Sequence, residues 1–158
     1  MLFRSIAIIH NGIIENYAEL QRELEARGHT LSTDVDTEVI AHLIEDAYQG
    51  DIRLAVAAVL PRLHGQWALV VMHRGEPGRI VAARREAPLV VGIGNGEQFL
   101  ASDPVAILEH TNKIVFLRDG DLADLQRDGI TMYDATGVSF APKIETIAWD
   151  GEIGRAHV

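Results

Sequence analysis

Cysteine is absent from this 158-residue chain, and long apolar runs and basic residues are scarce. Without cysteine the chain has no disulfide framework, no thiolate metal site and no thiol nucleophile. Its apolar runs, such as Ala55–Leu60 and Trp67–Met72, are far too short to cross a bilayer. The 14 Lys and Arg face 23 Asp and Glu, and this net charge of −9 argues against nucleic acid as a partner.

The rest of the composition is typical of one globular domain. Hydrophobic residues make up 47% of the chain, which is enough for a sizeable core at this length. We therefore expect an acidic cytoplasmic protein that binds neither nucleic acid nor a membrane.

Hydrophobic periodicity predicts helices in the first half of the chain and strands in the second. Helices are expected from Asn16 to about Arg27, from Asp36 or Thr37 to Gly50, and from Asp51 to about Leu63, each capped by its first residue. Strands are expected at 6–10, 30–33, 67–73, 79–83, 89–93, 98–101, 113–117, 121–126 and 130–133, with a short helix at 104–109. This order predicts an α+β fold in which helices cover antiparallel sheets.

The segment 6–16, with the sequence IAIIHNGIIEN, carries the most chemical information. Its apolar residues predict a buried strand that ends in a polar turn at Asn11 and Gly12. Taken alone, an Asn-Gly pair is most often a structural turn. An amide side chain beside an accessible glycine N–H also supplies two donors of the kind that form an oxyanion hole.

A second segment, DTEVIAHL at 36–43, begins 24 residues after Gly12. Together the two segments resemble the glutaminase domain of the glutamine–fructose-6-phosphate aminotransferase family, and the resemblance extends over residues 6–152. In class II amidotransferases the matching Asn side chain and Gly N–H form the oxyanion hole, and the matching Asp binds the α-ammonium of glutamine. The resemblance therefore assigns Asn11 and Gly12 to the oxyanion hole and Asp36 to substrate binding.

Asp36 has two competing uses. As a helix N-cap it would contribute about 1 kcal/mol, although Thr37 could serve instead. As a ligand for glutamine it must lie within roughly 10–12 Å of Asn11, given hydrogen bonds of about 3 Å at each end of the substrate. Its carboxylate must then face the same concavity, without a buried salt bridge of its own.

The resemblance also implies a fold and a reaction. The fold is the N-terminal-nucleophile (Ntn) hydrolase αββα sandwich, here truncated at the N-terminus. In the family a cysteine thiolate attacks the glutamine amide, and the released ammonia reaches an isomerase domain that binds fructose 6-phosphate. The nucleophile would lie upstream of Ile6 and the isomerase domains downstream of Glu152, so we expect the chain alone to be inactive. The family implies a homo-oligomeric parent enzyme, and we expect no cofactor and no metal.

Other assignments fit the same residues. The chain could derive from another class II amidotransferase, of the purine or asparagine synthesis type, or be a non-catalytic regulatory or interaction module. The ends, residues 1–5 and 153–158, read as in-frame translations of sequencing-adaptor DNA, so we expect them to pack against nothing and the partial amidotransferase domain to occupy 6–152.

Two further patterns favour structural roles. The glycine cluster Gly92–Gly96 is followed by a predicted strand rather than a helix, which indicates a hairpin and not a phosphate-binding loop. The seven histidines are scattered and form no metal-binding helical pair.

Overall fold

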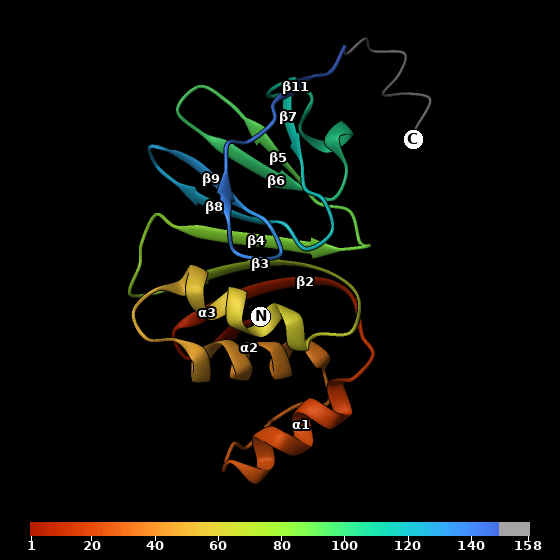
Figure 1. The fold of residues 1–158 in the computed structure, drawn as a ribbon, viewed down its shortest axis with the longest axis vertical. Helices are drawn as coiled ribbons and strands as arrows, with labels where there is room; N and C mark the ends of the chain where they lie inside the picture. Colours follow the sequence, from red (N-terminus) through yellow and green to blue (C-terminus); the bar gives the residue numbers. More distant parts are fainter. Residues whose placement is uncertain (149–158) are drawn as a thin grey trace.

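The computed structural model describes residues 1–148, in which two antiparallel sheets pack face to face (Figure 1). The strands are β1 (Leu2–Phe3), β2 (Ile6–Ile14), β3 (Gly65–His73), β4 (Ile80–Arg85), β5 (Val90–Ile93), β6 (Gln98–Ala101), β7 (Lys113–Phe116), β8 (Leu122–Gln126), β9 (Gly129–Tyr133), β10 (Ser139–Phe140) and β11 (Glu145–Thr146). The larger sheet has the order β1-β2-β3-β4-β8-β9-β10, and the smaller has the order β11-β7-β5-β6.

Helices cover one face of the larger sheet. They are α1 (Tyr17–Ala26), α2 (Asp36–Ala47) and α3 (Ile52–Val59), followed by the 3₁₀ turn η1 (Leu60–Arg62); a second 3₁₀ turn, η2 (Pro104–Ile107), lies beside the smaller sheet. In Figure 1, α2 and α3 lie along β2 and β3, and α1 lies outside α2. Of the four expected αββα layers, one helical layer and both sheets are therefore present. Among residues 1–148, the second helical layer, outside the smaller sheet, consists only of η2.

Two apolar clusters join these layers. The first lies between the helices and the larger sheet and includes Ile8, Leu24, Ile40, Val56 and Trp67. The second joins the two sheets and includes Ala82, Ala123, Val91 and Val115. Small side chains on the larger sheet and branched ones on the smaller allow the sheets to approach closely, as in other sandwiches.

Most predicted elements are confirmed. Asp51 caps α3, because its carboxylate accepts hydrogen bonds from the N–H groups of Arg53 (2.9 Å) and Leu54 (3.3 Å). The predicted strand at 30–33 is wrong, because that segment is a loop. The predicted helix at 104–109 is only the 3₁₀ turn η2, with Asp103 as its cap. The two-residue strands β1, β10 and β11 were not predicted.

The first residues are part of the sheet. Leu2 pairs with Ala7 and Phe3 with Ile6, and the Phe3 ring packs against the His42 ring at a tilt of 32°, with centroids 4.0 Å apart. The expectation that residues 1–5 pack against nothing is therefore wrong. The other suspected end, 153–158, lies outside the described residues.

The helix-free face of β2 is partly exposed. Ile9 and Ile13 retain 65% and 68% of their accessible surface, because the smaller sheet covers the β4–β8–β9 part of the larger sheet.

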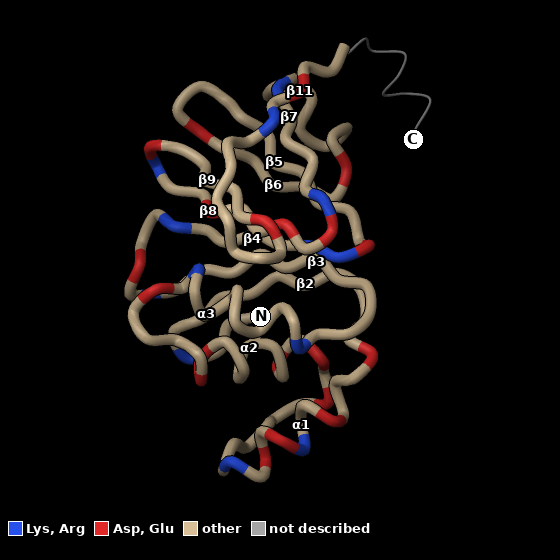
Figure 2. Tube along the Cα trace, viewed as in Figure 1, with Lys and Arg blue, Asp and Glu red and all other residues tan. Residues whose placement is uncertain are grey.

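The Lys and Arg residues are spread over many of the helices, strands and loops (Figure 2). Among the described residues, no helix has both the length and the apolar character that crossing a bilayer requires.

Candidate functional site

The Asn11-Gly12 pair lies inside strand β2, not in a turn that follows it. The register with β3 is continuous from Ile6 opposite His73 to Ile14 opposite Gly65. The predicted strand end at His10 is therefore wrong. Pairing with β3 continues the strand past Asn-Gly, overriding the local turn preference of these two residues.

The direction of each N–H in β2 follows from this register. The N–H of Glu15 donates to the His64 carbonyl and the N–H of Arg74 donates to the Ser5 carbonyl, so the odd-numbered residues of β2 bond to β3. Gly12 is even-numbered and directs its N–H to the opposite edge. Ile8 and Ile14 do the same, and their N–H groups donate to the Met1 carbonyl and the Asp36 carboxylate. The Gly12 N–H thus faces the edge of β2 that β3 leaves free.

Only glycine fits at position 12. Its φ is +100°, a region that L side chains rarely adopt, and a Cβ there would lie 2.0 Å from the Gln66 carbonyl oxygen. Asn11 beside it is exposed. The motif therefore presents an exposed amide side chain next to a backbone N–H that no side chain of residue 12 shields.

Asp36 lies along the same edge of β2. Its Oδ2 accepts a hydrogen bond from the Ile14 N–H at 3.1 Å, and its Oδ1 lies 3.6 Å from Nδ1 of His10. The predicted capping role is wrong for both candidates: Val35 is the N-cap of α2, and no side chain caps this helix. The Asp36 side chain remains 21% exposed, which leaves carboxylate lone pairs accessible to a ligand.

The structure thus brings Asp36 close to the Asn-Gly pair. Asp36 contacts Ile14 and His10, which are three residues and one residue from Asn11. At about 3.4 Å per strand residue, these contacts place the carboxylate within roughly 10 Å of Asn11. The contact with His10 is no salt bridge at neutral pH, because burial lowers the pKa of His10 more than the nearby Asp36 raises it.

His10 connects the strand to the start of α2. Its side chain is 2% exposed, and Nδ1 lies 3.1 Å from the Thr37 hydroxyl oxygen. Nε2 is buried and has no partner among the described residues, so the neutral ring is best accommodated with its proton on Nδ1, directed at Thr37 and Asp36. The sequence motif includes His10, but nothing in the sequence indicated that it would contact Asp36.

We expect His10→Leu to loosen the contact between Asp36 and β2, whereas His10→Asn should retain it by placing an amide N–H where Nδ1 now lies. Without its polar neighbour, Asp36 should hold the Ile14 N–H less well. Amide hydrogen exchange at Ile14 should then accelerate about tenfold, the equivalent of one lost hydrogen bond. The Glu15 amide, which bonds to β3, serves as the internal control; equal acceleration at both amides would show general fraying instead.

A buried carboxylate fixes the first turns of α2. Glu38 is 3% exposed, and each of its two oxygens accepts two hydrogen bonds. Oε1 accepts from Ser32 N (2.7 Å) and Ser32 Oγ (3.0 Å), while Oε2 accepts from Thr33 N (2.8 Å) and Thr33 Oγ1. Burial by itself raises the pKa of Glu38, but the Thr33 and Ser32 hydrogen bonds outweigh it and lower that pKa from 4.5 to about 2.

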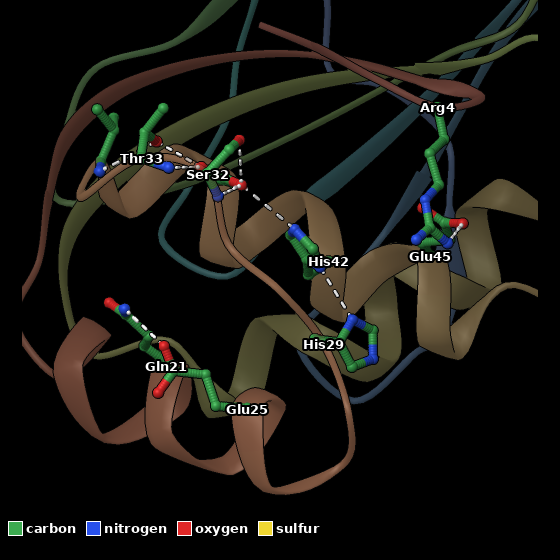
Figure 3. Close-up of polar contacts among 10 residues, drawn as sticks. Arg4, Gln21, Glu25, His29, Ser32, Thr33, His42 and Glu45 are labelled. Carbon is green, nitrogen blue, oxygen red and sulfur yellow. Dashed lines mark hydrogen bonds and ion pairs between the residues drawn. The ribbon is translucent and has the colours of Figure 1, made fainter.

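Two histidines continue this polar cluster toward solvent (Figure 3). His42 Nδ1 lies 2.9 Å from His29 Nδ1, and His29 Nε2 lies 2.9 Å from the Asp46 carboxylate. Burial is the main cause of the lowered pKa of His42, and the Glu38 carboxylate, whose Oε1 lies 3.5 Å from Nε2, opposes it. The cluster ties the loop after α1 to α2, and so helps to hold the helix whose first residue is Asp36.

No group of three or more His, Cys, Asp or Glu side chains in residues 1–148 is placed to hold a metal ion. The glycine cluster forms the tip of the β5–β6 hairpin, as its sequence predicted. The Glu38 cluster was missed, because its donors come from a loop that was predicted as a strand.

Comparisons with known proteins show what the chain is similar to. Residues 1–109 match the family described as "Glutamine amidotransferase domain". The chain is 47% identical over 145 residues to the glutamine–fructose-6-phosphate aminotransferase [isomerizing] of Thermotoga maritima. This alignment covers 92% of this chain and 24% of that protein. It is 45% identical over 150 residues to the enzyme of the same name from Methanothermobacter thermautotrophicus, with 94% of this chain and 25% of that protein covered. The chain thus spans about a quarter of the length of these relatives.

Among solved structures, the glutamine phosphoribosylpyrophosphate amidotransferase of B. subtilis is similar, with a TM-score of 0.74 and 26% identity. That match covers 85% of this chain and 31% of the other. A glutamine aminotransferase class-II domain protein from Silicibacter pomeroyi shares the fold, with a TM-score of 0.54 and 20% identity.

Proposed function

Because this chain belongs to the glutamine amidotransferase domain family, we propose that it supplies the glutamine-binding and oxyanion-stabilising part of a glutamine–fructose-6-phosphate aminotransferase. The complete enzyme would transfer the amide nitrogen of glutamine to fructose 6-phosphate, giving glucosamine 6-phosphate and glutamate. Identities of 44–47% to relatives with this name, against 26% for the phosphoribosylpyrophosphate enzyme, favour this assignment over the purine type.

The observation that carries the proposal is the shared edge of β2. Gly12 N–H and the Ile14 N–H that binds Asp36 point the same way, two residues or about 7 Å apart along the strand. The side-chain amide and the α-ammonium of glutamine are about four bonds apart, roughly 5 Å. A glutamine lying along this edge can therefore place its amide near Asn11 and Gly12 while its ammonium reaches Asp36.

The chemistry follows from the charges at each end. Attack on the amide carbon builds up negative charge on the carbonyl oxygen. The Asn11 side-chain N–H and the Gly12 backbone N–H donate hydrogen bonds to that oxygen. Asp36 accepts from the α-ammonium, which selects free glutamine over amides that lack this group. The attacking thiolate is not among these 158 residues, which contain no cysteine, so we expect no ammonia release from this chain alone.

The same proposal extends to the setting of the complete enzyme. We infer a cytoplasmic homo-oligomer that acts without nucleic acid, membrane or resident cofactor. The support is the kinship with aminotransferases of small metabolites and the net charge of −9.

Binding tests the proposal directly. We expect L-glutamine to bind at least tenfold more tightly than 4-carbamoylbutanoate, which is glutamine without its α-ammonium, because a charge-assisted hydrogen bond is lost. In Asp36→Asn this preference should disappear. Both affinities are measured by titration while following the Gly12 and Ile14 amide resonances.

The matched control is Asp34→Asn, which removes an exposed carboxylate two residues away and should leave the preference intact. A preference that survives Asp36→Asn would remove Asp36 from the site. Absence of any shift at Gly12 in saturating glutamine would overturn the placement of the amide.

A further inference from the structure

The structure contains a cavity that none of Asn11, Gly12 and Asp36 lines, although Trp67 in its lining pairs with Gly12 across β2 and β3. It has a volume of about 490 Å³ and opens between α3, the end of β4, the β8–β9 pair and the loop at 134–137. The apolar part of its lining includes Ala57, Leu60, Trp67, Leu122 and Tyr133. A mostly apolar cavity of this size with a few converging polar groups is typical of small-molecule sites.

Two arginines in this cavity have no acidic partner. Arg53 and Arg85 both line it, and neither pairs with a carboxylate among residues 1–148, whereas Arg79 and Arg84 do. The guanidinium carbon of Arg53 lies 4.0 Å from the centre of the Tyr133 ring, which holds the group over an aromatic face. Both guanidinium groups therefore keep their hydrogen-bond donors available.

The two acids at the cavity are already engaged. Asp119 pairs with Arg84 at 3.0 Å and accepts from the Glu86 N–H at 2.8 Å. Asp134 accepts from the N–H and hydroxyl of Thr136 and from the Val138 N–H. Neither carboxylate neutralises Arg53 or Arg85.

Trp67 contributes its indole ring to the lining of the cavity. The side chain is 2% exposed and lines the cavity, and Nε1 is buried without an acceptor among the described residues. Because Nε1 has essentially no accessible surface, an oxygen of a ligand in the cavity does not reach it, and the indole ring offers such a ligand an apolar face. Tryptophan and two unpaired guanidinium groups thus line one largely apolar cavity.

We propose that this cavity binds a small organic anion with an apolar body, its carboxylate or phosphate between Arg53 and Arg85 and its apolar body against the rings of Trp67 and Tyr133. The net charge of −9 does not prevent this, because charges beyond about 8–10 Å are screened at physiological salt. The site does not depend on the proposed function, since it uses none of the residues assigned to glutamine.

The test is a titration of the intact chain with 2-naphthoate, 2-naphthyl phosphate and the neutral 2-naphthamide, followed at the two tryptophan indole N–H resonances. Trp149→Phe identifies which resonance belongs to Trp67. We expect the Trp67 resonance to shift with one or both anions, and the neutral amide to bind about tenfold more weakly. The anion that binds more tightly distinguishes a carboxylate site from a phosphate site.

Arg53→Gln and Arg85→Gln should each weaken binding about tenfold, as expected for the loss of a charge-assisted hydrogen bond. Arg127→Gln is the control, because Arg127 also lacks a carboxylate partner in residues 1–148 but lines a different cavity. Arg85 is exposed, so Arg85→Gln is expected to fold even if Arg53→Gln does not. No shift at Trp67 with either anion, equal binding of the neutral amide, or equal weakening by Arg127→Gln would each overturn the proposal.

Discussion

Gly12→Ala is expected to lower the free energy of unfolding by about 4 kcal/mol. A strained backbone conformation at φ +100° costs alanine about 1–3 kcal/mol. The new Cβ would lie 2.0 Å from the Gln66 carbonyl oxygen, and forcing the strands apart to relieve this costs about 1–3 kcal/mol more. The backbone of β3 cannot move without disturbing its pairing with β4, so little relaxation is available.

Gly50→Ala separates the two contributions. Gly50 has a nearly identical φ of +105°, but a Cβ there would meet nothing within 4 Å. This variant should lose only about 1–3 kcal/mol, from backbone strain alone. Urea unfolding of both variants measures the difference, and equal losses would mean that the close approach of β2 and β3 is easily relieved.

Glu38→Gln is the second large effect, with an expected loss of about 3 kcal/mol at pH 7. One carboxylate oxygen becomes an NH₂ group that faces a backbone N–H of Ser32 or Thr33. The hydroxyls of these residues can rotate to accept a hydrogen bond, but the N–H cannot, so a buried donor loses its partner. Glu25→Gln on the exposed face of α1 should change stability by less than about 0.5 kcal/mol.

The pH dependence gives an independent measure of the same interaction. Since the folded-state pKa of Glu38 is lowered from 4.5 to about 2, this group contributes about 3 kcal/mol above pH 4.5. That contribution is lost as the pH falls from 4.5 to about 2, because protonation removes the charge that the four donors stabilise. The wild-type chain and Glu38→Gln should therefore converge in stability over this range; a constant difference would assign the loss to packing.

The sequence predicted the elements whose information is local. The cap at Asp51 and the β5–β6 hairpin were foreseen, because a cap and a tight turn depend on a few adjacent residues. The loop 30–33 was misread as a strand, because its Ser and Thr donors serve a carboxylate several residues further along the chain. Strands as short as β1 and β11 have too few residues to show a periodicity.

In the candidate site, too, features that depend on adjacent residues were predicted, and features that depend on distant residues were not. Asn11, Gly12 and Asp36 were identified from their motifs, but their common edge depends on strand pairing between residues far apart in the chain. The local turn preference of Asn-Gly predicted a strand end, and pairing with β3 overrode it. Likewise, the local capping preference of Asp36 gave way to the Ile14 N–H, a donor 22 residues away.

The pairing of β2 with β3 also sets when the site can form during synthesis. It joins residues that are 51 positions apart at one end (Ile14 and Gly65) and 67 at the other (Ile6 and His73). Helices α1–α3 lie between the two strands and form from local contacts, whereas a pairing of this span must first close a long loop. A nascent chain that has not yet emerged past residue 67 therefore has the Asn-Gly motif but lacks the part of β3 that aligns it, because Trp67 pairs with Gly12 and Gly65 with Ile14. The first residues of β3 to leave the ribosome thus align the part of β2 along which Gly12 and Asp36 meet, before the pairing of Ile6 with His73 completes the strand.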